Sequence, residues 1–305
     1  MTDGCNLYLT EKDLEQIEKS ISAGISLDEK NSVRDQLYNV SKNETVFLKA
    51  LSDPKTSEYK VIDSMLRVAY HDDITKNDQN KLPRALYTVL KAMPNTPGLF
   101  QSIPKPRGSF SSRMQHSGEL IVAAGIIQAE KIKTSLGKEL VIDKNNLKLV
   151  FGQKFPSKHV SSKNTMESDA QFYLKQGEIG IDIKYSKSST KYGVKGKDRF
   201  NNQLEGIRNC FSDGSLNGYH FISNVEFSSD FIEKINNCNI LIFQDRLSRD
   251  MEMRDNFMNS EEQKGSLMSE SIEELKSIFE PKELNAIAQK YDIPQIGYCE
   301  NLTFK

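Results

Sequence analysis

The alternation of apolar and polar positions between residues 179 and 185 predicts a half-buried β-strand. The apolar positions are Ile179, Ile181, Ile183 and Tyr185, and the positions between them are Gly180, Asp182 and Lys184. A period of two sends the first group to one face of a sheet and the second group to the other. The polar face of such a strand usually carries neutral residues, so an acid and a lysine two positions apart need an explanation.

Helical periodicity dominates the first 94 residues. Apolar residues recur at helical spacing and predict helices at residues 10–24, 57–71 and 82–93. Pro94 and Pro97 end the last of these helices. A loop rich in Pro, Gly and Ser is expected from residue 95 to residue 115. Ser117 is then expected to cap a strongly apolar helix that reaches about Lys133.

Strands with short helices between them are expected from about residue 139 onward. Strand-like runs cover residues 139–152, 168–187, 218–227 and 239–245, and helical patterns cover residues 200–210 and 228–236. The tail from residue 251 is acidic and is expected to be helical, with a short strand near Thr303. Together these elements predict an α/β fold with a central mixed β-sheet flanked by helices, preceded by an N-terminal helical region.

The hairpin that contains the alternating strand has a predicted register. If Gln176–Gly177 is its two-residue turn, Gln171 lies opposite Asp182 and Asp169 lies opposite Lys184. Opposed Cβ atoms in such a pair are about 5 Å apart, and diagonal ones are about 7–8 Å apart. Asp169, Asp182 and Lys184 should therefore converge on one face of the sheet.

Two carboxylates and a lysine at that separation suit the hydrolysis of a phosphodiester. Close carboxylates repel unless a cation neutralises them, and two of them with waters and phosphate oxygens form a typical Mg²⁺ site. The metal would lower the pKa of a bound water and stabilise charge on the phosphorus, while Lys184 would hold the attacking water or a non-bridging oxygen. The alternative is a cross-strand salt bridge between Asp169 and Lys184, with Asp182 incidental.

These residues resemble the signature of the PD-(D/E)XK nuclease superfamily. The pattern of that family is matched by Asp169 and, after twelve intervening residues, by Asp182 and Lys184, which flank one apolar residue. Ser168 stands in place of the usual Pro. The resemblance covers roughly residues 115–245 and implies a restriction-endonuclease-like core. It also implies that the two acids bind one or two Mg²⁺ ions and that all three residues are catalytic. A chain of this size with its own N-terminal region is similar to type II restriction endonucleases.

An acid on an upstream helix completes the family pattern, and Glu119 is the matching candidate for a further catalytic and metal-binding residue. Two residues after Ser117 as the N-cap, a glutamate is also favourable simply because it lies at the positive end of the helix dipole. Plain capping electrostatics is therefore the alternative. Glu130, on the same helix, and Glu205, on the helix after the basic segment, are further candidates.

The chain has a net charge of only −1 but contains two segments that are locally basic. The first runs from residue 79 to residue 118, has no acid, and contains Lys81, Arg84, Lys91, Lys105, Arg107 and Arg113. The second follows the alternating strand and contains Lys187, Lys191, Lys195, Lys197 and Arg199 against Asp198 alone. Such segments are typical of proteins that track a phosphate backbone, so these five residues, with Arg107 and Arg113, are predicted to bind DNA. A solvated loop is the alternative for either segment.

Composition and the absence of common motifs argue against several other classes of protein. The longest apolar run, residues 120–127, is too short to span a bilayer, and the acidic start lacks the features of a signal peptide. Cys5, Cys210, Cys238 and Cys299 are scattered, which favours free thiols in a reducing cytoplasm. The chain contains no phosphate-binding loop, dinucleotide-binding or HExxH motif, and its four histidines are isolated, so a zinc site is not indicated.

The resemblance and the basic segments together imply a cytoplasmic Mg²⁺-dependent endonuclease that makes double-strand breaks in DNA at specific sites. A homodimer would supply two equivalent active sites, and a cognate DNA methyltransferase would act on the same sequence. Residues 1–100 are expected to serve DNA recognition or dimerisation, residues 101–250 to form the nuclease core, and residues 251–305 to form a helical extension. The alternatives are a repair or phage-defence nuclease of the same fold, and a catalytically inactive module that binds DNA or a protein.

Overall fold

The structure is a computed structural model of the 305-residue chain. It describes residues 26–41, 44–70, 74–92, 110–142, 147–155, 166–174, 177–187, 190–194, 196–250 and 281–305. The helices are α2 (Leu27–Ser41), α3 (Glu44–Ser52), α4 (Ser57–Tyr70), α5 (Lys76–Ala92), α7 (Phe110–Ala129), α8 (Lys197–Ser212), α9 (Ser229–Arg249) and α12 (Pro281–Lys290). The strands are β1 (Lys131–Lys133), β2 (Glu139–Val141), β3 (Leu147–Phe155), β4 (Met166–Leu174), β5 (Gly177–Lys184), β6 (Gly218–Ser223) and β7 (Ile296–Cys299).

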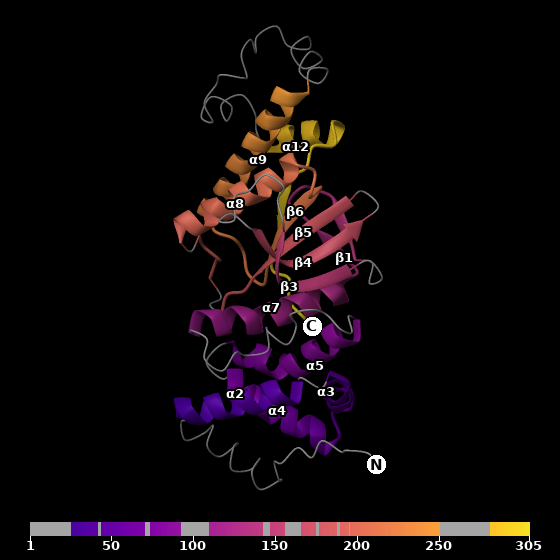
Figure 1. The fold of residues 1–305 in the computed structure, drawn as a ribbon, viewed down its shortest axis with the longest axis vertical. Coiled ribbons are helices and arrows are strands. Elements are labelled where there is room, and N and C mark those ends of the chain that lie inside the picture. Colours follow the sequence, from indigo (N-terminus) through magenta and orange to yellow (C-terminus); the bar gives the residue numbers. More distant parts are fainter. Residues whose placement is uncertain are drawn as a thin grey trace.

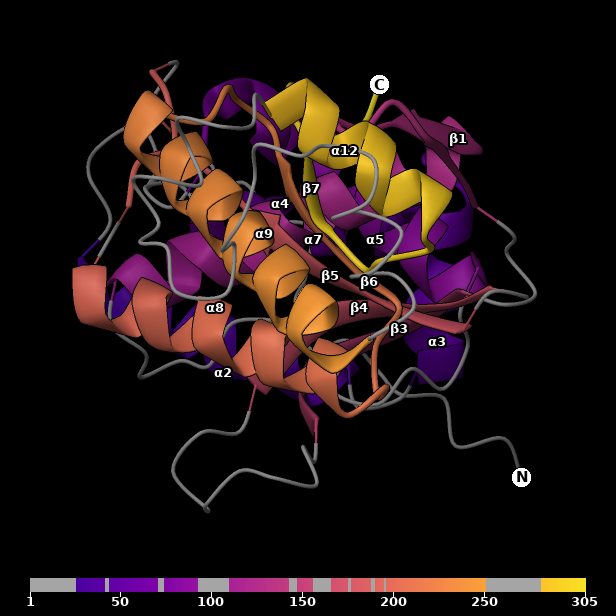
Figure 2. The ribbon, with the colours of Figure 1, turned by 90° about the horizontal axis from the view of Figure 1, so that it is seen from above.

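A mixed five-stranded sheet forms the centre of the molecule. Its strand order is β3-β4-β5-β6-β7, with β3, β4 and β5 antiparallel and β5, β6 and β7 parallel. Helices α2 to α5 gather at one end of the long axis, and α7 lies between them and the sheet (Figure 1). Helices α8, α9 and α12 cover the other side, as the view from above shows (Figure 2). The predicted α/β class with a mixed central sheet between helices is confirmed.

The two faces of the sheet belong to two different hydrophobic clusters. On β5, Ile181 and Ile183 are fully buried in a cluster with α7 and the N-terminal helices. On β6, Tyr219 and Phe221 are buried in a second cluster with α8, α9 and α12. Because successive strand residues point to opposite faces, β6 is buried on both sides. The alternating strand β5 and the uniformly buried strand β6 are therefore both central strands.

Helices account for two differences from the predicted elements. The run at residues 239–245, predicted as a strand, lies inside α9. A short apolar run fits a buried helix segment as well as a strand, and here α9 buries Ile240, Ile242 and Phe243. The helix expected to begin at Ser117 begins seven residues earlier, at Phe110, so Ser117 is not its N-cap.

One predicted N-terminal helix is confirmed in position, and α2 and α3 were not predicted as separate helices. Helix α4 matches the predicted helix at residues 57–71, whereas α5 begins at Lys76, before the predicted start, and contains Pro83. Thr75 caps α5, since its hydroxyl oxygen accepts a hydrogen bond from the Asp78 N–H at 3.1 Å. The helix predicted at residues 10–24 lies outside the described residues.

The last residues of the chain connect the sheet to the N-terminal helices. The strand predicted near Thr303 is wrong in position, because Thr303 lies outside any strand and the last strand is β7, which pairs with β6. Beyond it, the Leu302 N–H donates to the Ser223 carbonyl at 2.9 Å, and Lys81 Nζ donates to the Phe304 carbonyl at 2.8 Å. Residues 251–280 are outside the described ranges. No helix in the described ranges is both long enough and apolar enough to cross a membrane.

Candidate active site

The register of the β4–β5 hairpin differs by two residues from the prediction. Gln171 pairs with Gly180 and Leu174 pairs with Gly177, so the predicted pairing of Gln171 with Asp182 is wrong. The predicted turn at Gln176–Gly177 is wrong for the same reason, because Gly177 already belongs to the ladder. A shift by two keeps every residue on its predicted face, whereas a shift by one would have reversed the faces.

In this register the backbone positions of Asp169 and Asp182 are closer along the ladder than in the predicted register. The ladder ends at the pair of Ala170 with Ile181. Continued by one step, the same register would set Asp169 opposite Asp182 rather than opposite Lys184. Opposed residues of an antiparallel pair share a face and have Cβ atoms about 5 Å apart. The structure describes the backbone of β4 and not its side chains, so the position of the Asp169 carboxylate lies outside the described part of the chain.

A β-bulge lies beside Asp169 on the other neighbouring strand. Strand β3 pairs with β4 in one register up to Leu149–Ala170 and in another from Gln153–Ser168 onward. Asp169 lies between these two pairs. Bulges bend a strand and re-aim side chains, and they are common next to active sites. The extra residues lie on β3, so the bulged strand is the neighbour of Asp169 and not the strand that carries it.

Asp182 and Lys184 lie together on the α8 side of β5. Their side chains are 5% and 12% exposed, and Lys184 Nζ is 2.5 Å from Asp182 Oδ1. The Lys184 ammonium is also 5.7 Å from the centre of the Phe221 ring, which allows a cation–π contact. Charged groups so largely shielded from water are costly unless paired, and the contact between Lys184 and Asp182 offsets part of that cost.

Gln203 completes this cluster, and the sequence patterns did not identify it. Its side-chain amide on α8 donates to the other oxygen, Asp182 Oδ2. Gln203 lies between Phe200 and Leu204, which are buried on the inner face of α8. A polar residue within an apolar helical stripe is the signal that could have identified it.

Glu119 lies in the middle of α7 and is 2% exposed. The preceding residue, Gly118, packs directly against Tyr185, which follows Lys184 at the end of β5. Because α7 begins at Phe110, Glu119 is not in the first turn, and its interpretation as a capping acid is wrong. Glu130 follows the end of α7, and Glu205 is exposed on α8.

The acids of this region have the donor chemistry that Mg²⁺ prefers. Mg²⁺ binds through one or two carboxylates together with waters and phosphate oxygens, and Asp182 is a buried carboxylate next to the backbone position of Asp169. Among the side chains that the structure describes, no three His, Cys, Asp or Glu residues form a metal-ligand group. Asp169 is not among those side chains.

The basic segment after β5 is exposed where it is described. Lys187, Lys191, Lys197 and Arg199 are exposed. Lys191 forms an ion pair with Glu226 at 3.3 Å, and the strand-like bridge between Tyr192 and Phe227 holds the segment against the start of α9. Lys195 and Arg107 lie outside the described residues, and Arg113 lies in α7 with its side chain not described.

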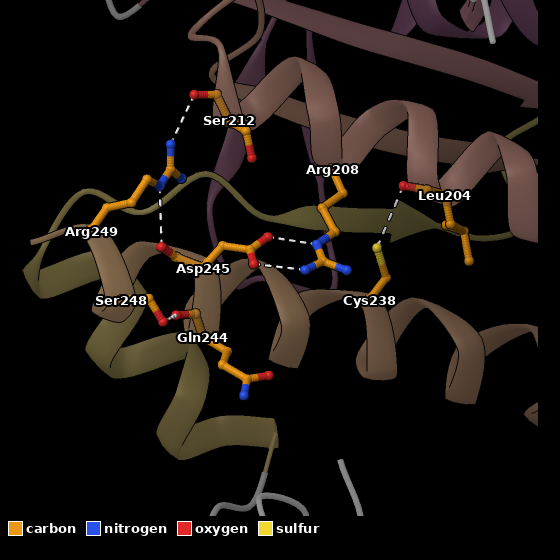
Figure 3. A network of polar contacts seen from close by, with 8 residues as sticks. All are labelled: Leu204, Arg208, Ser212, Cys238, Gln244, Asp245, Ser248 and Arg249. Carbon is orange, nitrogen blue, oxygen red and sulfur yellow. Dashed lines mark hydrogen bonds and ion pairs between the residues drawn. The ribbon is translucent and has the colours of Figure 1, made fainter. Parts of the chain in front are cut away.

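An ion pair fixes α8, the helix that carries Gln203, against α9 (Figure 3). Arg208 Nε and Nη2 donate to the two oxygens of Asp245 at 2.5 and 2.6 Å. Next to it, Arg249 Nη1 donates to the Ser212 carbonyl at 2.8 Å. The pKa of the Arg208 guanidinium is raised, mainly by its hydrogen bonds with Asp245.

Comparison with known proteins adds nothing to this geometry. No protein-family model, no curated protein and no solved structure matches the chain. The function is therefore argued from the residues and their arrangement.

Proposed function

We propose that this protein is a metal-dependent DNA endonuclease whose active site is formed by Asp182, Lys184 and Asp169. The observation that carries the proposal is the Asp182–Lys184 pair, largely shielded from solvent on one face of β5, with Asp169 one residue beyond the end of the β4–β5 ladder. Buried charges are costly. A sheet face that keeps an acid and a lysine near a second acid therefore favours a catalytic role over a purely structural salt bridge.

The mixed sheet between two helical layers supports a restriction-endonuclease-like core. In such a site Asp182 and Asp169 would hold one or two Mg²⁺ ions, which when bound supply a water of lowered pKa. Glu119 would join them only beyond the end of β5, because α7 packs on the face of the sheet opposite Asp182. The Lys184 ammonium would donate to the attacking water or to a non-bridging phosphate oxygen. Gln203 would keep the Asp182 carboxylate in its orientation through the hydrogen bond to Oδ2.

Site-specific double-strand cutting, as in type II restriction enzymes, is the form of the proposal that the resemblance favours. Two equivalent active sites in a homodimer would cut both strands of a palindromic site, and a methyltransferase of the same specificity would protect the host DNA. Discrete plasmid fragments would support this form. A smear would indicate a less specific nuclease, such as a repair or phage-defence enzyme.

The test is plasmid cleavage in Mg²⁺ by the wild type and by single variants. Asp182→Ala and Lys184→Ala should each lower the rate by about 10²–10³-fold or more, because each removes a group that acts on the metal or the transition state. Lys131→Ala is the matched control, since Lys131 also pairs with an acid, Glu139, at 3.5 Å on an exposed hairpin. Cleavage by Asp182→Ala at the wild-type rate would refute the proposed site.

A catalytically inactive DNA-binding module is the second candidate. Asp182 Oδ2 accepts a hydrogen bond from Gln203, and Oδ1 is in an ion pair with Lys184 although it has no hydrogen-bond partner among the described residues. An ion pair of this kind is also found in purely structural roles. That candidate predicts DNA binding without cleavage in any divalent cation. It also predicts that Asp182→Ala lowers the unfolding temperature while DNA affinity stays the same.

A further inference from the structure

Tyr185 directly follows Lys184 and is in contact with two helices at once. Its side chain is 2% exposed and lies in the cluster that β5 shares with α7 and the N-terminal helices. Burial, and then the nearby Asp78, raise the pKa of its hydroxyl, which therefore stays protonated and acts as a donor.

The ring of Tyr185 lies against the backbone of α7 at Gly118. A Cβ atom at Gly118 would be only 1.9 Å from Tyr185 Cγ and 2.2 Å from Cδ1, so no other residue fits without movement of the strand or the helix. The residue after Gly118 is Glu119, and the residue before Tyr185 is Lys184. This one contact therefore sets the separation between two backbone segments that carry predicted site residues.

The hydroxyl of Tyr185 is held by α5. It donates to Asp78 Oδ2 at 2.5 Å, and the Thr75 hydroxyl donates to the same oxygen at 2.8 Å. Asp78 is 7% exposed, so these hydrogen bonds are shielded from water. The ring and hydroxyl of one side chain thus join β5 to α7 and to the start of α5.

We infer that Tyr185 is a positioning residue of the candidate active site, fixing the end of β5 relative to α7 and to the N-terminal helices. The inference rests on the proposed function for its catalytic consequence, whereas the contacts themselves do not depend on it. Catalytic groups must be held within fractions of an ångström, and a displacement of about 1 Å can cost roughly 10²-fold in rate. The N-terminal helices would therefore contribute to catalysis without touching the substrate.

Tyr185→Phe tests this inference because it keeps the ring against Gly118 and removes only the hydroxyl. Three quantities are measured: single-turnover cleavage in Mg²⁺, DNA affinity in Ca²⁺, and amide hydrogen exchange at residues 182–186 and 117–120. Cleavage should slow by about 10- to 100-fold with DNA affinity unchanged, and exchange should quicken in both segments. Tyr87→Phe is the matched control, since Tyr87 is a half-buried tyrosine on the same helix as Asp78.

Variants of Asp78 separate the hydrogen bond from general destabilisation. Asp78→Asn keeps an oxygen that can accept from Tyr185 and should cleave nearly as fast as the wild type. Asp78→Ala should cleave as slowly as Tyr185→Phe, and the double variant should be no slower than the slower single variant. A merely structural role would leave the single-turnover rate of the folded variants unchanged.

The outcomes for the inference and for the proposed function are distinct. If the wild type cleaves and Tyr185→Phe matches it in rate and exchange, the inference is wrong and the proposed function stands. If the wild type does not cleave, the proposed function is wrong, and with it the catalytic role of Tyr185. Unchanged exchange in both segments would overturn the inference whether or not the wild type cleaves.

Discussion

Burial in the sheet keeps His220 uncharged at neutral pH. It lies on β6 opposite Gly297 of β7, and burial lowers the pKa of its imidazole to about 4. A Cβ atom at Gly297 would be 2.6 Å from His220 Nδ1, so the glycine is required for the close approach of the two strands. The Nδ1 atom has no hydrogen-bond partner among the described residues. Protonation of this ring would place an unpaired positive charge in the buried sheet, which would destabilise the folded chain.

His220 should make the protein lose stability in mild acid. Its folded-state pKa lies below the ordinary value of 6.5, so the unfolded chain takes up the proton first as the pH falls. The contribution to stability is fully present above about pH 6.5 and is lost between about pH 6.5 and pH 4, amounting to about 3 kcal/mol. Urea denaturation at pH 7 and pH 4 measures it. His220→Leu should lack this part of the pH dependence, and an equal dependence in both proteins would contradict the assignment.

The buried thiols are poor candidates for chemistry at neutral pH. Burial raises the pKa of Cys238 to about 12 and that of Cys299 to about 11. The reactive form of a cysteine is the thiolate, which is scarce at such values. The three cysteines in the described part of the chain, Cys210, Cys238 and Cys299, are free, as the scattered positions predicted.

At the scale of elements, helices and strands could be predicted from the sequence where the periodicity of apolar residues was unambiguous. The alternation in β5 and the amphipathic pattern of α8 identified both elements, and the parity of β5 showed which residues share a face. The prediction of a half-buried strand is wrong, because α8 covers the face of β5 that carries Asp182. The register was off by two because the turn chemistry at Gln176 is weak, and parity cannot distinguish registers that differ by two. The contacts of Gln203 and Tyr185 were not predictable, because both are made with residues far away along the chain.

The ion pair between α8 and α9 should contribute measurable stability. Arg208 and Asp245 form two parallel hydrogen bonds and are 33% and 27% exposed, so the pair is better shielded than a surface ion pair. A double-mutant cycle with Arg208→Ala and Asp245→Ala should give a coupling energy of about 1–2 kcal/mol by chemical denaturation.

The pair of Arg67 with Asp63 on α4 provides the comparison for this cycle. It joins residues four positions apart on one helix, and the arginine is 45% exposed. Its coupling energy should be only about 0.3–0.5 kcal/mol. If the two cycles gave equal energies, the α8–α9 pair would be no more than a surface interaction.

At the scale of the whole molecule, the charge distribution predicts how DNA binding depends on salt. If Lys197 and Arg199 bind phosphates, replacing both with Ala should weaken binding to specific and random DNA by similar factors. The slope of log affinity against log salt should flatten by roughly 0.9 for each phosphate that the protein no longer neutralises. Binding is measured in Ca²⁺, under conditions without cleavage. Parental affinity and slope in the double variant would show that DNA lies elsewhere.

Lys191 offers an internal control for this salt dependence. It is exposed, as Lys197 is, but its ammonium already pairs with Glu226 at 3.3 Å. Fewer counterions would then be released when it meets a phosphate, so Lys191→Ala should change the slope by less than Lys197→Ala. Equal changes would show that the Glu226 pair opens in the complex.

The position of β7 has a consequence for the order of events during protein synthesis. Its residues complete the sheet beside β6, and the residues after it bond to Ser223 and Lys81, which are made much earlier. At roughly 5–20 residues per second, the ribosome needs about 4–15 s to make residues 224–295 after β6 has been made. Throughout that interval β6, which is buried in the finished protein, has an open edge. A nascent chain that stalls in this window would present an unpaired strand to its neighbours on the polysome, so the protein should depend on chaperones most strongly there.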